Sequence, residues 1–392
     1  MVGKAKETDP SFELRKFVAP EVVYGQGAFS LAGRYVTNLM AQNVFLVSDL
    51  GVRKVGLTDD LERMLVDSGL EFITYEDISA NPKDHEVMKG AELYQENDCD
   101  VILALGGGSP MDCAKGIGVV VTNNKDVKEF EGVDMVETPG PPLVCIPTTA
   151  GTSADVSQFA IINDVAGRRK FAVISKTMVP DVSLIDPRTT VTLNKELTAD
   201  TGMDALSHAL EAFASTASSP LTDLHAMEAV RLIWNNLPLV IDRPDDLVLR
   251  NKVMLGSMMA GFAFSNASLG LVHAMAHSLE GFSGAAHGRC NAVLLEHAVE
   301  YNWPSASAKY ARLIDIMSEG PVPVTGEGVD AFLEGLREFR RSLGIKGGLA
   351  RTGLRKADIP ALSRNALNDP CLATNPRRIT VEEIGRLYER AL

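Results

Sequence analysis

The segment VILALGGGSPMD, residues 101–112, joins an apolar run to three glycines and to residues that favour the start of a helix. A continuous apolar run is typical of a strand buried on both faces of a parallel sheet. After the glycines, Ser109 is expected as the N-cap of a helix, with Pro110 at its first position and Asp112 completing a capping-box-like pair. The segment therefore predicts a strand, a tight glycine turn and a helix.

Short β-rich runs alternate with helical stretches on both sides of this segment. Such alternation predicts a parallel sheet with helices on both faces. Beyond Pro187, Ala, Leu and Met recur at helical spacing without β-branched clusters, so the second half is expected to be mostly helix, with a boundary near 187–192. The expected strands are 43–49, 71–78, 101–109, 142–153, 170–175 and 182–187, and the helices of the first half include 56–70 and 85–97.

Length, composition and charge exclude several classes of protein. At about 150 residues a domain, 392 residues predict two or three domains. The excess of 51 Asp and Glu over 38 Lys and Arg gives a net charge of −13, which disfavours binding to nucleic acid or anionic lipid. No apolar run approaches the roughly 18 residues that span a bilayer, and the N-terminal stretch lacks the apolar region of a secretory signal. We expect a cytoplasmic protein with neither a nucleic-acid nor a membrane partner.

The five cysteines are scattered along the chain and form no CxxC pair. An odd number at wide spacing argues against a disulfide framework or a thiolate zinc site. We expect the thiols to be reduced and mostly buried.

The glycine turn has two interpretations. Glycines let backbone N–H groups approach an anion without interference from a Cβ, and the positive end of the following helix favours negative charge there. Because ligands of open α/β sheets bind beyond the carboxyl ends of the strands, Gly107, Gly108 and Ser109 could cradle a diphosphate. The alternative is a plain tight turn.

Polar side chains also stand at two other strand ends. Asp49 ends the first clear strand, where a carboxylate can accept hydrogen bonds from ribose hydroxyls and repel a 2′-phosphate, which favours NAD over NADP. The alternative is that Asp49 caps the turn before Gly51. Thr148, Thr149 and Thr152 place hydroxyls at another strand end, where they suit contacts with a diphosphate or adenine.

The helical half contains a candidate metal centre. Asp204 and His208 are four residues apart, so on a helix both side chains project from one face. His273 and His277 repeat this spacing, and His287 follows a glycine-containing connection. One carboxylate with several imidazoles suits a first-row divalent metal such as Fe²⁺, Zn²⁺ or Mn²⁺. The alternative is that these histidines are hydrogen-bonded core residues. Spacing alone does not decide whether His273 or His277 is the ligand, or which metal is bound.

Taken together, these motifs resemble the iron-containing (group III) alcohol dehydrogenase family. The resemblance implies an α/β NAD-binding domain with a Rossmann-like parallel sheet at 1–189. It implies an all-helical metal-binding domain at 190–392, in an architecture like that of dehydroquinate synthase. The segments that carry it are GGGSPMDCAKGIG (106–118), PTTAGTSADVS (147–157), GMDALSHALEAF (202–213), GLVHAMAHSLEGFSGAAHGRCNAVLLEH (270–297) and CLATNPRRITVEEIGRLYERAL (371–392).

The resemblance also implies roles for individual residues. His277 would stand beside the metal as a catalytic residue on the substrate side or in a proton relay. Lys170 would reach the nicotinamide ribose, and Asp49 would select NAD. The implied ligands of one Fe²⁺, with Zn²⁺ as the alternative metal, are Asp204, His208, His273 and His287, and the other implied NAD contacts are Gly107, Gly108, Ser109, Thr148 and Thr149.

The expected activity is hydride transfer between NAD and a short primary alcohol, with an aldehyde as the other partner of the couple. Apolar residues around the histidines favour a small, ethanol-like substrate. A diol or lactaldehyde reductase of the same family, a dehydroquinate synthase-like lyase and a non-catalytic metal or nucleotide sensor are the alternatives. The lyase would need basic residues for its phosphorylated, carboxylated substrate, and 202–287 contains very few. The resemblance further implies a homo-oligomer, a dimer or larger.

Overall fold

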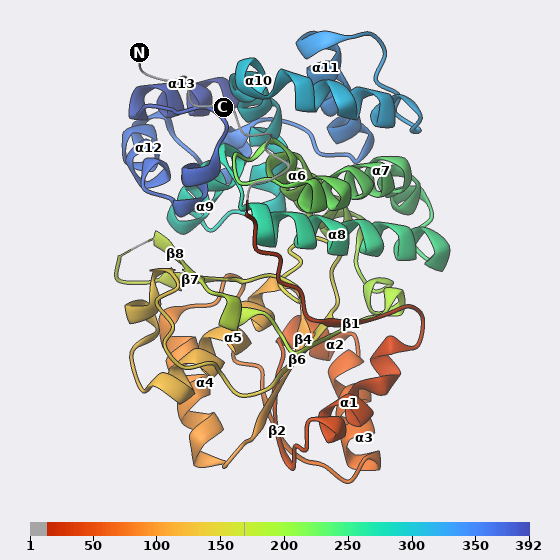
Figure 1. Cartoon of the computed structure of the whole chain (residues 1–392), viewed down its shortest axis with the longest axis vertical. Helices are drawn as coiled ribbons and strands as arrows, with labels where there is room; N and C mark the ends of the chain where they lie inside the picture. Colours follow the sequence, from red (N-terminus) through yellow and green to blue (C-terminus); the bar gives the residue numbers. More distant parts are fainter. Residues whose placement is uncertain (1–13, 168) are drawn as a thin grey trace, which may run out of the picture.

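The computed structural model describes residues 14–167 and 169–392. In Figure 1 the first half of the chain forms a lower layer built around a sheet, and helices α6 to α13 form the upper layer. This arrangement confirms the expected fold class of a parallel α/β domain followed by a helical one. The N-terminal stretch in which we expected no secretory signal lies largely outside the described residues.

The main sheet has six strands, and all of its neighbouring pairs are parallel. Its spatial order is β1-β9-β6-β4-β2-β3, which places β4 at the centre, next to β2 and β6. The bounds are β1 (Glu21–Tyr24), β2 (Asn43–Val47), β3 (Glu71–Tyr75), β4 (Val101–Gly106), β6 (Leu143–Pro147) and β9 (Val182–Ile185).

Helices cover both faces of this sheet, which explains why its central strands are apolar throughout. Successive side chains of a strand point to opposite faces, and in β2 both Phe45 and its neighbour Leu46 are fully buried. Phe45 packs in a cluster with residues of α4 and α5, whereas Leu46 packs with residues of α1 and α3. These helices are α1 (Ala32–Asn38), α2 (Leu50–Lys54), α3 (Leu57–Asp67), α4 (Asp84–Glu96) and α5 (Gly108–Asn123).

A second, smaller sheet contains three strands in the order β5-β8-β7. The strand expected at 170–175 belongs here, as part of an antiparallel pair between β7 and β8. No local pattern in the sequence had predicted β7. The bounds are β5 (Gly132–Val133), β7 (Phe159–Asp164) and β8 (Arg169–Ile174).

The start of α5 differs from the expectation. Gly107 is the N-cap and Gly108 begins the helix, with no side-chain capping bond. Ser109 therefore lies inside the first turn, where its Oγ accepts a hydrogen bond from the Asn81 backbone N–H at 3.1 Å. Asp112 is partly buried and accepts a hydrogen bond from the backbone of Ile161 in β7. The predicted Ser109 cap and capping box are wrong, because the helix starts directly at the glycine turn.

The helical domain surrounds α6, which is buried along nearly its whole length. A helix that is apolar on all sides belongs in a core, so the few polar side chains of α6 need a specific reason to be there. All five cysteines of the chain are free, as expected. The helices are α6 (Lys195–Ala214), α7 (Pro220–Asp242), α8 (Leu247–Ala267), α9 (Leu271–Ser283), α10 (His287–Ser318), α11 (Gly328–Ser342), α12 (Ile359–Leu367) and α13 (Val381–Ala391).

Within 14–167 and 169–392, no single helix is long and apolar enough to cross a membrane. By length and composition, α8 and α9 would suffice only as a pair, and that pair is bent by 98°.

Candidate active site

A cavity of about 490 Å³ extends from the carboxyl ends of the parallel strands to the helical domain. Its lining includes every residue that the sequence analysis assigned to the metal, to the dinucleotide or to catalysis. The strand ends contribute Asp49, Gly107, Gly108, Ser109, Thr148 and Thr149, β8 contributes Lys170, and the helical domain contributes Asp204, His208, His273, His277 and His287.

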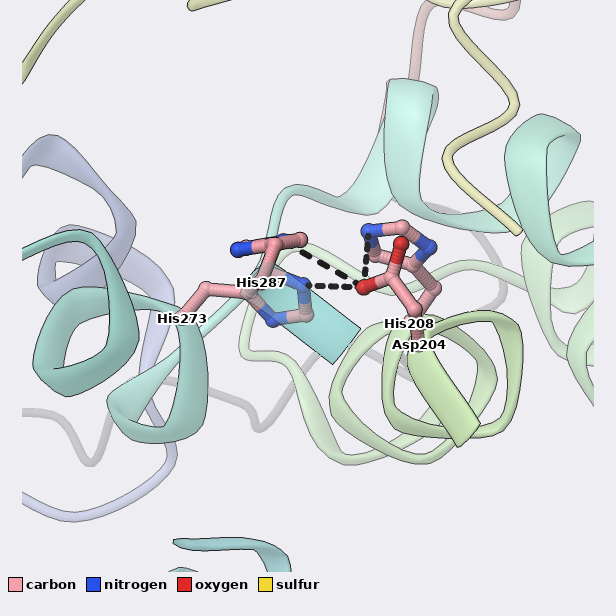
Figure 2. Close-up of side chains that lie close together, drawn as sticks. All are labelled: Asp204, His208, His273 and His287. Atoms are coloured by element: carbon pink, nitrogen blue, oxygen red, sulfur yellow. Dashed lines mark ion pairs between the residues drawn. The ribbon is translucent and has the colours of Figure 1, made fainter. Parts of the chain in front are cut away.

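Four of these side chains converge on one point, although they come from three helices. Figure 2 shows His208, His273 and His287 around the carboxylate of Asp204. From Asp204 Oδ1, the Nε2 atoms lie at 3.6 Å in His208, 3.5 Å in His273 and 3.3 Å in His287. Asp204 and His208 occupy successive turns of α6, as their spacing predicted, whereas α9 and α10 bring the other two imidazoles.

The spacing of these four groups fits a single metal ion. Each offers one ligand atom, and the four atoms lie within 4.8 Å of one another. For bonds of about 2.1 Å, neighbouring corners of a tetrahedral site are roughly 3.4 Å apart. The observed oxygen-to-nitrogen distances scatter around that value. A carboxylate and three imidazoles form a donor set suited to Fe²⁺ or Zn²⁺.

Two buried glutamates orient the imidazoles of this cluster. Glu211 Oε2 lies 2.5 Å from His273 Nδ1, and Glu280 Oε1 accepts a hydrogen bond from His287 Nδ1. A carboxylate at Nδ1 fixes the ring orientation and directs Nε2 toward the metal position. Neither glutamate was predicted from the sequence, because both occur in ordinary helical segments.

The electrostatics of the cluster favour a cation. Burial lowers the pKa of His208 to about 3, so that this imidazole is neutral and free to coordinate. Burial alone would raise the pKa of Asp204, but the charge of His287 and the hydrogen bonds from His273 and His287 hold it well below its usual value. Burial would likewise lower the pKa of His287, yet Glu280 and Asp204 raise it to about 10. The surrounding carboxylates thus stabilise positive charge at this point.

Asn291 is a further polar residue at the cluster. Its Nδ2 lies 2.8 Å from Asp204 Oδ1, and 3.1 and 3.2 Å from the Nε2 atoms of His273 and His287. The sequence contained a signal for it, because Asn291 follows His287 by one helical turn. Its amide adds a fifth polar group at the proposed metal position.

The structure separates His277 from the four clustered residues. Its Nδ1 lies 2.9 Å from Oδ2 of Asp369, and its ring centroid is 5.6 Å from that of His287. Asp369 directly precedes the short 3-10 helix η8 (Pro370–Thr374), and its other oxygen accepts from the Cys371 backbone N–H. His277 therefore lies beside the cluster and lines the cavity, held by its own carboxylate.

At the other end of the cavity, the strand-end loops pack tightly. A Cβ on Gly107 would lie 3.2 Å from Thr149, and one on Gly108 would lie 2.9 Å from Thr152. The glycines thus permit close approach of the two loops. Asp49 Oδ1 accepts from the Gly51 N–H at 2.7 Å and also from Val52, so the capping interpretation is correct. The same carboxylate lines the cavity, which leaves the NAD-selecting role open to test.

Lys170 connects the two domains. Its ammonium donates to Asn81 Oδ1 at 2.9 Å and forms an ion pair with Glu280. Lys170 was expected at the nicotinamide ribose, and it does line the cavity, but its charge is matched by a carboxylate of the helical domain. The sequence offered no sign of this partner.

Comparison with known proteins agrees with this architecture. Residues 19–187 match the family model for iron-containing alcohol dehydrogenase, and 198–392 match the model for the C-terminal part of the same family. The chain is 33% identical to the NAD-dependent methanol dehydrogenase of Bacillus methanolicus, over 96% of this chain and 99% of that one. It is 35% identical to the 1,3-propanediol dehydrogenase of Klebsiella pneumoniae, over 97% of this chain and 100% of that one.

The fold is shared with solved structures as well. The crystal structure of a 1,3-propanediol oxidoreductase superposes with a TM-score of 0.93 at 34% identity, covering 97% of this chain and 100% of that chain. An alcohol dehydrogenase from Oenococcus oeni gives a TM-score of 0.92 at 33% identity, covering 97% of this chain and 100% of the other. The chain therefore belongs to the iron-containing alcohol dehydrogenase family.

Proposed function

We propose that this protein is an NAD-dependent, iron-dependent alcohol dehydrogenase that interconverts a short primary alcohol and its aldehyde. The observation that carries the proposal is the shared cavity, in which the Asp204 cluster and the glycine and threonine loops line one continuous space. Membership of the family and the similarity to an NAD-dependent relative support the same cofactors.

Different residues of the cavity would hold the metal and exchange the proton. When bound, Fe²⁺ would supply a Lewis acid for the oxygen of an alcohol, and NAD would supply the hydride acceptor. Asp204, His208, His273 and His287 would hold the ion, with Glu211 and Glu280 keeping two imidazoles in place. His277 donates from Nδ1 to Asp369, which leaves its Nε2 available to exchange a proton with the hydroxyl of the substrate.

The wall next to the metal position favours an apolar substrate. Phe264 stacks on His208 at a centroid distance of 4.3 Å, and Phe159 packs against Phe264 at 5.6 Å. Leu269 lines the same cavity. These side chains offer no hydrogen bond to a second hydroxyl, which supports an ethanol-like alcohol. A diol or lactaldehyde reductase is the second candidate, supported by the similarity to 1,3-propanediol dehydrogenase and lactaldehyde reductase.

The lining also supports the dehydrogenase over the lyase. Along the part of the cavity formed by described residues, Lys170 is the only Lys or Arg. A phosphorylated, carboxylated substrate would require several cationic partners. This composition supports a neutral substrate.

An alcohol panel with anaerobically iron-loaded protein tests the proposal. We expect NADH formation, measured by absorbance, with a higher kcat/KM for ethanol or 1-propanol than for 1,3-propanediol, and the reverse reaction with the aldehydes. A higher kcat/KM for the diol or for lactaldehyde would favour the second candidate. No turnover of any alcohol or aldehyde by metal-loaded protein would contradict the dehydrogenase and favour the lyase or sensor.

Cofactor selection can be tested at Asp49. Replacing it with serine should raise the ratio of kcat/KM for NADP over NAD by about tenfold or more, because a carboxylate facing a 2′-phosphate costs binding energy. Serine is itself a good N-cap, so Asp49→Ser should leave the start of α2 intact. The measurement is steady-state kinetics with both cofactors, and an unchanged ratio would show that Asp49 only caps the helix.

We further propose a cytoplasmic protein that forms a homodimer or a larger homo-oligomer. The free cysteines support a reducing compartment, and the association is inferred from family membership. Light scattering of the purified protein would measure its mass in solution, and a monomer would contradict the association.

A further inference from the structure

Two kinds of contact between the domains lie beside the cavity, one made of neutral hydrogen bonds and one made of charged groups. The first is a network of neutral hydrogen bonds between the loop after β6 and α8. Ser153 Oγ donates to the Ser257 carbonyl at 2.7 Å, and Gln158 bonds to Ser265 through both its backbone and its side chain. The second contact lies between β8 and α9, which Figure 1 shows one above the other, and it depends on charge.

Glu280 is the centre of this charged contact. Its side chain is fully buried, and the side chain of its partner Lys170 is only 6% exposed. Oε2 of Glu280 accepts from Lys170 Nζ, and Oε1 accepts from Nδ1 of His287. One carboxylate therefore bridges a lysine of the first domain and an imidazole of the metal cluster.

The backbone fixes this bridge in place. Gly281 follows Glu280, and a Cβ there would lie 3.2 Å from the backbone nitrogen of Lys170 and 3.2 Å from the Arg169 Cα. This close approach of α9 to β8 keeps the two charged side chains next to each other. A buried carboxylate depends strongly on its few partners, so a change at one oxygen alters the interaction at the other.

Glu211 provides an internal comparison. It accepts from Nδ1 of His273 just as Glu280 accepts from His287. Its second oxygen, however, accepts from the Val272 backbone N–H at 2.6 Å, within the helical domain. Both glutamates support the metal cluster, but the bridge from Glu280 ends on a cavity-lining lysine of the other domain.

We propose that Glu280 couples occupancy of the metal centre to dinucleotide affinity by sharing its charge between His287 and Lys170. A divalent cation at Nε2 of His287 brings more positive charge toward Glu280 than the proton that it replaces. This draws the carboxylate toward the imidazole and weakens its ion pair with Lys170, whose ammonium then interacts more strongly with the oxygens of the dinucleotide. Coupling between two binding sites is reciprocal, so the dinucleotide tightens metal binding by the same factor. This inference rests on the proposed metal and NAD sites.

The test compares the dissociation constant of NADH for chelator-stripped protein with that for protein at saturating Fe²⁺. Both constants are measured from the fluorescence of NADH under anaerobic conditions. NADH is used because its nicotinamide is uncharged and so is not repelled by the ion. For the unmodified protein we expect Fe²⁺ to lower the constant by about fivefold or more, within the range typical of coupled sites. Glu280→Gln keeps the shape of the side chain but loses its charge. In this variant Fe²⁺ should lower the dissociation constant of NADH by less than about twofold.

Two further variants make the test specific. Glu211→Gln should weaken metal binding. At saturating Fe²⁺, however, the metal should still lower the dissociation constant of NADH about fivefold, because Glu211 does not contact Lys170. In Lys170→Met, as in Glu280→Gln, Fe²⁺ should no longer lower the dissociation constant of NADH appreciably. Circular dichroism checks that each variant is folded.

The outcomes separate this inference from the proposed function. An equal NADH constant with and without Fe²⁺ in the unmodified protein, or a retained change in Glu280→Gln, would overturn the coupling while leaving both binding sites standing. Failure of NADH to bind either form of the unmodified protein would overturn the proposed function and the coupling together.

Discussion

Replacing Asp204 with alanine is expected to empty the metal centre and to lower kcat/KM by about 10³-fold or more. Its Oδ1 faces the Nε2 atoms of all three clustered imidazoles within 3.6 Å, and it is the anionic member of the four-residue group. Without it, a divalent cation would be bound by neutral nitrogens alone in a buried site. Loss of the several kcal/mol that a metal supplies to the transition state corresponds to this factor.

Elemental analysis and steady-state kinetics on the same preparation would measure both effects of Asp204→Ala. The matched control is Asp200→Asn, one turn earlier in α6, where the carboxylate pairs with Arg289 at 2.7 Å and is not one of the four clustered groups. The control should retain about one metal per chain. Stoichiometric metal in Asp204→Ala would show that the cluster is a hydrogen-bonded core and not a metal site.

The fold could be predicted where local pattern and burial agree. The strand of 101–105 is buried on both faces, and such a strand has to be continuously apolar, so its sequence identifies it. β1 has only four residues at the edge of the sheet, partly exposed, and was therefore missed. The placement of β8 in the second sheet depends on its pairing with β7, which no local pattern specifies.

The site, too, could be predicted only where a local pattern specifies it. Helical spacing placed Asp204 and His208 on one face of α6, because a ligand pair within one helix is a local property. Glu280 and Asp369 were not recognised, since an acidic residue in a helix or a turn usually faces solvent. Their burial follows from the packing of α9 against β8 and of η8 against α9, contacts between segments distant in sequence. Such supporting carboxylates became visible only with the tertiary structure.

The second large effect is expected at His277, and it should differ in kind from the first. His277→Ala should retain the metal and lower kcat by about 10²-fold or more, the contribution typical of a positioned proton-transfer group. The reason is geometric: His277 is not one of the four clustered ligand groups, yet it lines the same cavity and donates to its own carboxylate, Asp369, at 2.9 Å. Metal content and kcat, measured together, test both statements.

Comparison with His273→Ala makes this role specific, because His273 is four residues earlier on the same helix and belongs to the cluster. His273→Ala should lose metal as Asp204→Ala does, while His277→Ala should not. Asp369→Asn should lower kcat less than His277→Ala, because an amide can still accept from Nδ1 but carries no charge to stabilise the protonated imidazole. Equal metal loss in the two histidine variants would contradict the division between ligand and relay, and an unchanged kcat in metal-loaded His277→Ala would remove His277 from the reaction.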